Sequence, residues 1–158
     1  MDLYVVRHAA AVPERPDLPD PARPLTSEGR KRFERAAKGM DWFGVRIDRL
    51  HHSPWLRAVE TAELMTHLLS DGGQTVVDPG LTRPPDDDLL AGLDGQRVAV
   101  VGHQPWLTEL VSLLISGSPR HGARIDLRKG GLIWLQGDPR PRRMTLRVAL
   151  SPSVLRRV

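Results

Sequence analysis

Two histidines in the chain follow short apolar segments, and each ends a stretch that is typical of a buried strand. His8 comes just after Leu3–Val6, with Arg7 between them, and His103 follows the apolar run Arg97–Gly102. A neutral imidazole is a nucleophile, and a protonated one binds anions. The planar fork of an arginine matches the oxygens of a phosphate. These residue types therefore indicate a site for a doubly negative group such as phosphate.

A further arginine, Arg57, lies four residues after Ser53, where we expect a helix to start at Pro54. The free amides of a helix N-terminus favour a bound phosphate. We expect Ser53 to cap this helix or to orient Arg57 rather than to act as a nucleophile, because no base stands next to it. For His51 and His52, on the preceding strand, we expect a role in the core or in supporting the site.

The elements that must position these residues follow from the apolar pattern. Strands are expected at Leu3–Val6, Arg49–His52, Thr75–Val77, Arg97–Gly102, Leu132–Leu135 and Met144–Leu150. Helices are expected from Thr26 or Ser27 to about Phe43, from Pro54 to about Leu69 with Gly72-Gly73 as the break, and from Pro105 to about Ile115, with a short helix starting at Asp86–Asp88.

This alternation predicts an α/β fold, a three-layer sandwich with a mostly parallel sheet, helices on both faces and an antiparallel C-terminal strand. Ligands of such sheets bind outside the carboxyl ends of the strands. We therefore expect His8, Ser53 and His103 to meet at one edge of the sheet.

Length and composition exclude several classes of function. The 158 residues, of which none is cysteine, suit a single domain spanning 1–158 without a disulfide framework, a cysteine nucleophile or a cysteine-rich zinc site. The N-terminus lacks the layout of a signal peptide, and no apolar run approaches the ~20 residues of a membrane helix. We expect a soluble, cytoplasmic protein with no membrane partner.

The net charge of +4 is unevenly distributed. Residues 120–158 hold ten Lys and Arg against two Asp, a net charge of +8, whereas residues 1–119 carry a net charge of −4. The basic segment is either a solvated face or a docking surface for an acidic partner. We do not expect a nucleic-acid partner, because no aromatic residues are interleaved with the basic ones. No pattern in the sequence indicates an oligomeric state.

Four segments resemble, in the right order, the motifs of the histidine phosphatase superfamily, also called the phosphoglycerate mutase-like family. They are Val5–Ala9, Arg23–Arg30, Ser53–Glu63 and Val101–Pro105. Ala9 stands where the family usually has glycine, a small change that we expect to be tolerated. The short length, the stretch Asp20–Thr26 and the simple C-terminus look most like the SixA branch of phosphohistidine phosphatases.

The resemblance implies a metal-independent phosphatase that uses no cofactor and forms a phosphohistidine intermediate. In that mechanism His8 is the nucleophile, and Arg7, Arg57 and His103 hold the equatorial oxygens of the phosphoryl group. The amide of Gln104 adds a donor at the start of the following helix. His8 must be neutral whereas His103 helps most when protonated, so we expect their pKa values to be pushed apart.

One departure from the family pattern bears on the substrate. Many relatives carry a glutamate after the third strand, which protonates the leaving group; here the segment Asp78–Thr82 has Gly80 at that place. An imidazole leaves with less help from an acid than an alkoxide does. The sequence therefore favours phosphohistidine, or another activated phosphate, as the substrate, with phosphohistidine in a protein as the first choice. Asp86, Asp87 or Asp88 could instead supply the acid, although capping of a helix is the expected role of this run.

Other interpretations of the site stay open. It could act on a small phosphomonoester, or it could be a non-catalytic module that only binds phosphate. A metal site built from His8, His103 and nearby acids is a third possibility, which the two arginines oppose because they would repel a cation. We expect the loops 11–25 and 79–95 to select the rest of the substrate, and Trp55 or Trp106 to line the mouth of the pocket.

Overall fold

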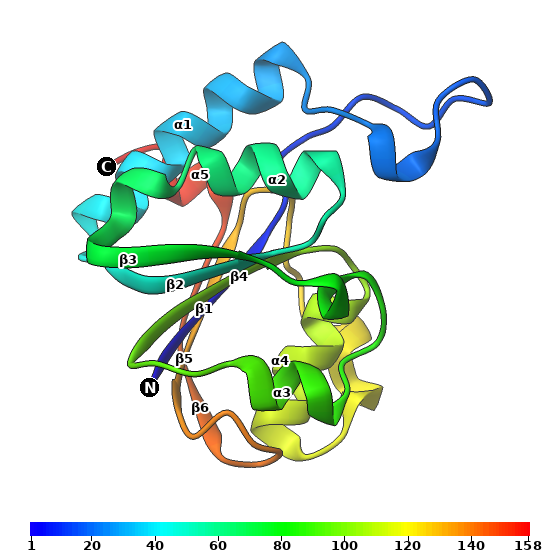
Figure 1. Cartoon of the computed structure of the whole chain (residues 1–158). Helices are drawn as coiled ribbons and strands as arrows, with labels where there is room; N and C mark the ends of the chain where they lie inside the picture. The colour runs from blue at the N-terminus through cyan, green and yellow to red at the C-terminus, as the bar shows by residue number, and fades with distance from the viewer.

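Six strands form one sheet, in the order β3-β2-β4-β1-β5-β6, in the computed structural model, which describes residues 1–158 (Figure 1). The strands are β1 (Asp2–Arg7), β2 (Ile47–His52), β3 (Leu69–Val77), β4 (Arg97–Gly102), β5 (Leu132–Gly137) and β6 (Met144–Leu150). The first four run parallel, β5 pairs antiparallel with β1, and β6 pairs antiparallel with β5. The predicted fold class is confirmed.

Helices cover both faces of the sheet. On one face lie α1 (Ser27–Trp42), α2 (Leu56–Glu63) and α5 (Pro152–Leu155), and on the other lie α3 (Asp87–Gly92) and α4 (Trp106–Ser116) (Figure 1). Side chains of a strand alternate between the faces, so Tyr4 and Val6 of β1 join one apolar cluster while Leu3 and Val5 join the other. The central strands are apolar throughout because both of their faces are buried. No helix is both long enough and apolar enough to span a membrane.

The start of α1 is fixed by two side chains. The hydroxyl of Thr26 accepts a hydrogen bond from the Gly29 backbone N–H at 2.9 Å, which caps the first turn. The Glu60 carboxylate of α2 accepts from the Leu25 backbone N–H at 2.6 Å and pairs with Arg30 of α1 at 2.8 Å. These contacts tie the end of the proline-rich loop to both helices beside the expected phosphate site.

The predicted helix from Pro54 to Leu69 is too long. The helix α2 ends at Glu63, and after a 3-10 turn at Thr66–Leu68 the strand β3 begins at Leu69. Met65 and Leu68 are fully buried, so burial of these two side chains turns the chain inward before a longer helix can form.

The expected helix break at Gly72-Gly73 is also wrong, because both glycines lie inside β3. Gly72 has a φ of +77° there, and the pairing of β2 with β3 shifts register between Ile47 and Arg49. Glycine tolerates the left-handed backbone that such an irregularity needs.

Several short helical segments have no counterpart in the predicted elements, among them 3-10 helices at Asp20–Ala22 and Pro79–Thr82. A 3-10 helix at Pro119–Arg124 follows α4, and α5 follows β6. The Ser151 hydroxyl caps α5 by accepting from the Val154 backbone N–H. Leu155 of α5 is fully buried against α1, where a Cβ on Gly39 would overlap the Leu155 carbonyl group. The small residue lets the two helices approach closely.

We predict that Gly39→Ala lowers the free energy of unfolding by about 1–3 kcal/mol, because the added methyl group must push α5 away from α1. Gly92→Ala in α3 is the matched control, since nothing lies within 4 Å of the added Cβ, and we expect it to be neutral or stabilising. Urea denaturation of both variants checks this. Equal stabilities would show that α5 is not packed as described.

Candidate active site

The side chains predicted to form a phosphate site come together at the carboxyl edge of the sheet. β2, β4 and β1 are neighbours, and Ser53, His103 and His8 directly follow their last residues. A pocket of about 590 Å³ lies there. Its lining comprises Arg7, His8, Pro13, Glu14, Asp20, Arg23, Trp55, Arg57, His103, Gln104, Trp106 and Lys129. The predicted nucleophile His8 and the four residues predicted to bind phosphate, Arg7, Arg57, His103 and Gln104, therefore line one pocket.

His8 is buried and has a defined tautomer. Its Nδ1 lies 2.7 Å from the carbonyl oxygen of Ala9, which can only accept, so Nδ1 carries the proton and Nε2 keeps a lone pair. Arg57 Nε donates to that Nε2 at 3.3 Å. The pKa of His8 is lowered to about 3, mainly because the ring is buried. The hydrogen bond to Ala9 opposes this shift, and the charges of His103, Arg57 and Arg7 add to it. The ring is therefore neutral at pH 7, and the lone pair on Nε2 accepts a hydrogen bond from Arg57.

His103 lies beside His8, with 5.1 Å between the ring centroids. Its Nε2 is 2.7 Å from the hydroxyl oxygen of the fully buried Ser53, which also accepts from the Trp55 backbone N–H. Ser53 thus orients a histidine of the site, a contact that local sequence did not reveal. The expectation that Ser53 caps the helix or orients Arg57 is wrong, because no side chain caps α2 and the Ser53 hydroxyl contacts the Trp55 N–H and His103 instead.

The expectation that the pKa values of the two histidines are pushed apart is wrong. Burial, followed by the charge of Arg57, lowers the pKa of His103 to about 3, the same value as for His8. Both rings are buried next to arginines, and both are penalised for carrying a proton.

Arg57 is held by a carboxylate that sequence reasoning missed. Its two terminal nitrogens donate to the carbonyl oxygen of Asp20 at 2.8 Å and to Asp20 Oδ2 at 3.1 Å. Arg23 donates from Nε to Asp20 Oδ1 at 2.7 Å. Burial alone would raise the pKa of Asp20, but hydrogen bonds and charge from Arg23 and Arg57 hold that pKa below its usual value. Asp20 is therefore an ion-paired carboxylate rather than a proton donor.

The sequence carried a faint signal for this cluster. Asp20 and Arg23 are opposite charges three residues apart in the proline-rich loop, next to the motif that begins at Arg23. The hydrogen bond between Asp20 and Arg57 joins positions 37 residues apart, and no local pattern in the sequence encodes that contact.

Two nitrogen atoms in the pocket have no hydrogen-bond partner. The Nε of Arg7 and the Nδ1 of His103 are buried without a hydrogen bond, although Arg7 also donates to the Leu127 carbonyl at 3.1 Å. Burial lowers the pKa values of Arg7 and Arg57, but a guanidinium remains charged at neutral pH. An unpaired buried polar group is costly, and an anion with several oxygens would accept a hydrogen bond from the Nε of Arg7.

Tryptophans form one wall of the pocket, as expected. The Trp55 ring lies 4.5 Å from the His103 ring and 6.0 Å from the Trp106 ring, measured between centroids. The Arg57 guanidinium lies over Trp55, 4.7 Å from its centroid. The wall therefore offers planar surfaces beside the cationic groups.

The aspartates considered as an acid do not line the pocket. The Asp86 carboxylate caps α3 through the Leu89 backbone N–H at 2.9 Å and pairs with Arg83, which is the expected capping role. Asp87 and Asp88 lie in the first turn of that helix.

His51 and His52 are buried outside the pocket, where they hold the backbone around β2. His51 Nδ1 lies 3.1 Å from Asp78 Oδ2, and His52 Nδ1 lies 3.0 Å from the Ser53 carbonyl oxygen. Both therefore support neighbouring structure. No group of three or more His, Asp or Glu side chains is arranged to hold a metal ion.

The comparisons with known proteins agree with this geometry. Residues 3–82 match the family model described as histidine phosphatase superfamily (branch 1). The chain belongs to the histidine phosphatase superfamily. An uncharacterized protein of Picosynechococcus sp. is 32% identical over 143 residues, which cover 86% of this chain and 85% of that protein.

Two solved structures extend the similarity to most of the chain. The protein histidine phosphatase SixA in complex with tungstate is 26% identical, with a TM-score of 0.77 over 97% of this chain and 98% of that one. A putative phosphohistidine phosphatase SixA from Agrobacterium tumefaciens is 22% identical, with a TM-score of 0.76 over 96% of this chain and 97% of its own. The chain is a SixA-type member of this family of phosphatases.

We predict that neither His8 nor His103 takes up a proton between about pH 8 and about pH 5 in the free protein, because burial holds both pKa values near 3. Long-range ¹H–¹⁵N NMR spectra, assigned with His8→Ala and His103→Ala, report the state of each ring. His8 should keep its proton on Nδ1 throughout. A midpoint near the ordinary value of about 6.5 would contradict the geometry described for that ring.

Proposed function

We propose that the protein is a metal-independent phosphatase in which His8 is the nucleophile. The observation that carries the proposal is the neutral His8 ring, whose Nε2 lone pair faces the cationic pocket while Nδ1–H is held by the Ala9 carbonyl. Nε2 attacks phosphorus, so that the bond from phosphorus to Nε2 forms as the bond to the leaving group breaks. Water then attacks the phosphohistidine, which releases inorganic phosphate and restores His8.

Arg7, Arg57 and His103 bind the oxygens of the transferring phosphoryl group. Two guanidinium groups offset the charge that spreads over these oxygens in the transition state. The hydrogen bond from Arg57 Nε to His8 Nε2, 3.3 Å long, gives way when phosphorus approaches, and Arg57 donates to an oxygen instead. The Gln104 amide, at the same edge, adds a further donor.

Asp20 has a positioning role in this scheme. It holds two nitrogens of Arg57, which leaves Nε directed at the place where the phosphoryl group must lie. Its negative charge also offsets part of the repulsion between Arg57 and Arg23.

We infer that the substrate is phosphohistidine in a protein. The pocket holds two carboxylates, of which Asp20 is ion-paired and Glu14 has a side chain that is 84% exposed. Such a pocket provides little general-acid assistance to the leaving group. An alkoxide leaving group needs this assistance, whereas an imidazole leaving group needs it much less. The Trp55 and Trp106 rings suit a planar imidazole as leaving group.

A small phosphomonoester on the same site is the second candidate. Glu14 favours it, since this carboxylate lines the pocket and could protonate a leaving alkoxide. A non-catalytic phosphate-binding module is the third candidate, and a substitution of the nucleophile separates it from both enzymes.

We predict that kcat/KM for a phosphohistidine peptide exceeds that for an alkyl phosphate by at least about 10²-fold, because no well-placed acid assists the alkoxide. Release of inorganic phosphate is measured for both substrates with and without EDTA, and EDTA should have no effect.

The control variant is His8→Ala, which should lose turnover of both substrates and keep phosphate binding. Equal efficiency on the two substrates would contradict the choice of phosphohistidine. Turnover that survives in His8→Ala would contradict the nucleophile, and absence of turnover in the unsubstituted protein would favour a binding module.

A further inference from the structure

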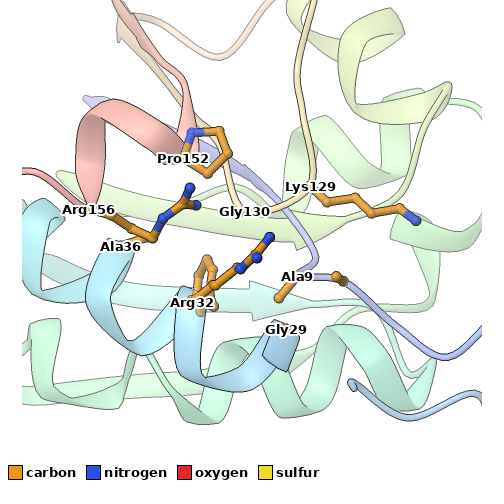
Figure 2. A pocket seen from close by; sticks show the side chains of 10 residues that line it. Ala9, Gly29, Arg32, Ala36, Lys129, Gly130, Pro152 and Arg156 are labelled. Atoms are coloured by element: carbon orange, nitrogen blue, oxygen red, sulfur yellow. The ribbon is translucent and has the colours of Figure 1, made fainter. Parts of the chain in front are cut away.

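A second, smaller cavity of about 200 Å³ lies beside the catalytic pocket (Figure 2). Its walls come from the segment after β1, from α1, from the loop before β5 and from the C-terminal helix α5. Ala9, which directly follows His8, and Lys129, which also lines the catalytic pocket, are part of its lining. The two hollows are therefore neighbours that share a side chain.

The charged groups around this cavity are all cationic. Arg32, Lys129 and Arg156 line it, and no carboxylate does. Figure 2 shows the side chains of Arg32 and Arg156 turned towards the same hollow, while Lys129 extends away from them. Arg32 uses Nε to pair with Glu28 at 2.6 Å, which leaves its other donors unused. The side chains of Arg156 and Lys129 form no ion pair and no hydrogen bond.

The remaining walls are apolar. Phe33 and Ala36 of α1 are buried, and Pro152 of α5 closes the side opposite Arg32 (Figure 2). A ligand with a short apolar stem and a carboxylate at its end matches this combination. The cavity volume of about 200 Å³ is below the usual range of small-molecule sites, ~300–1,000 Å³, so the cavity suits a single side chain better than a whole small molecule.

We propose that this cavity binds an acidic side chain, glutamate or aspartate, of the same phosphorylated protein whose phosphoryl group enters the catalytic pocket. The proposal rests on the proposed function, since it takes the substrate to be a protein. The carboxylate pairs with Arg32 and Arg156, and its methylene groups contact Phe33 and Pro152. Lys129 and Arg156 belong to the segment 120–158 with its net charge of +8, so this segment acts here as a docking surface for an acidic partner.

The test uses two phosphohistidine peptides that differ only in their flanking residues, glutamates in one and glutamines in the other. We expect the unsubstituted protein to have a KM about tenfold lower for the glutamate peptide, and the double variant Arg32→Gln/Arg156→Gln to lose this preference. Hydrolysis of phosphoramidate, which is too small to reach the cavity, should keep its kcat/KM.

The matched control is Arg120→Gln/Arg147→Gln, which removes the same charge from exposed arginines that line neither hollow and should keep the preference. If both double variants lose the preference for the glutamate peptide to the same extent, the proposal is overturned, because the overall positive charge of the protein would then explain the preference. Equal KM values for the two peptides in the unsubstituted protein would overturn it without any variant.

Binding of the unphosphorylated glutamate peptide, measured by fluorescence anisotropy, separates failure of this proposal from failure of the proposed function. This readout needs no turnover, and the Arg32→Gln/Arg156→Gln variant should weaken it about tenfold. If the variant weakens binding of inorganic sulfate but not of the peptide, the cavity is a site for free anions and the proposal is wrong.

Discussion

A neutral imidazole surrounded by guanidinium groups is the arrangement on which the rest of the site depends. His8 is almost wholly buried, and Arg7 and Arg57 each disfavour a proton on its ring. The Ala9 carbonyl fixes the remaining proton on Nδ1. Burial is the main reason that the ring is uncharged, and the cations beside it add to that effect. In the proposed mechanism the same cations attract the anion that the neutral ring attacks.

The sheet explains how this arrangement is reached and kept. Three adjacent parallel strands end at one edge, and each passes directly into a residue of the site or of its support. Both faces of these strands are packed under helices, so the strand ends have little freedom to move. The cost of placing several cations together is offset by Asp20, which reaches the pocket on a loop and pairs with two of the arginines. Rigid strands hold the histidines and a loop supplies the counter-charge.

Much of this could be predicted from residues that lie close together in sequence. The positions of His8, Ser53 and His103 at strand ends follow from apolar runs and from the general behaviour of α/β sheets. What could not be predicted depends on contacts between distant segments, such as the closure of Asp20 onto Arg57.

The depth at which side chains are buried could not be predicted either, because it also depends on contacts between distant segments. The equal lowering of the two histidine pKa values follows from how deeply both rings are packed, which the residue types do not encode. The second cavity is assembled from segments at both ends of the chain, and Arg32 and Arg156, far apart in sequence, carry no joint pattern. The early end of α2 likewise followed from the burial of Met65 and Leu68, a tertiary effect that outweighed local helix propensity.

The central claim is that the phosphoryl group passes through Nε2 of His8, and trapping it there is the most direct test. The protein is mixed with a phosphohistidine peptide, quenched in alkali within milliseconds, digested and mapped by mass spectrometry. The account predicts a phosphorylated peptide that contains His8, with phosphorus on Nε2, and no such adduct on His103. An adduct on another residue, or steady turnover with none on His8 at any quench time, would contradict it.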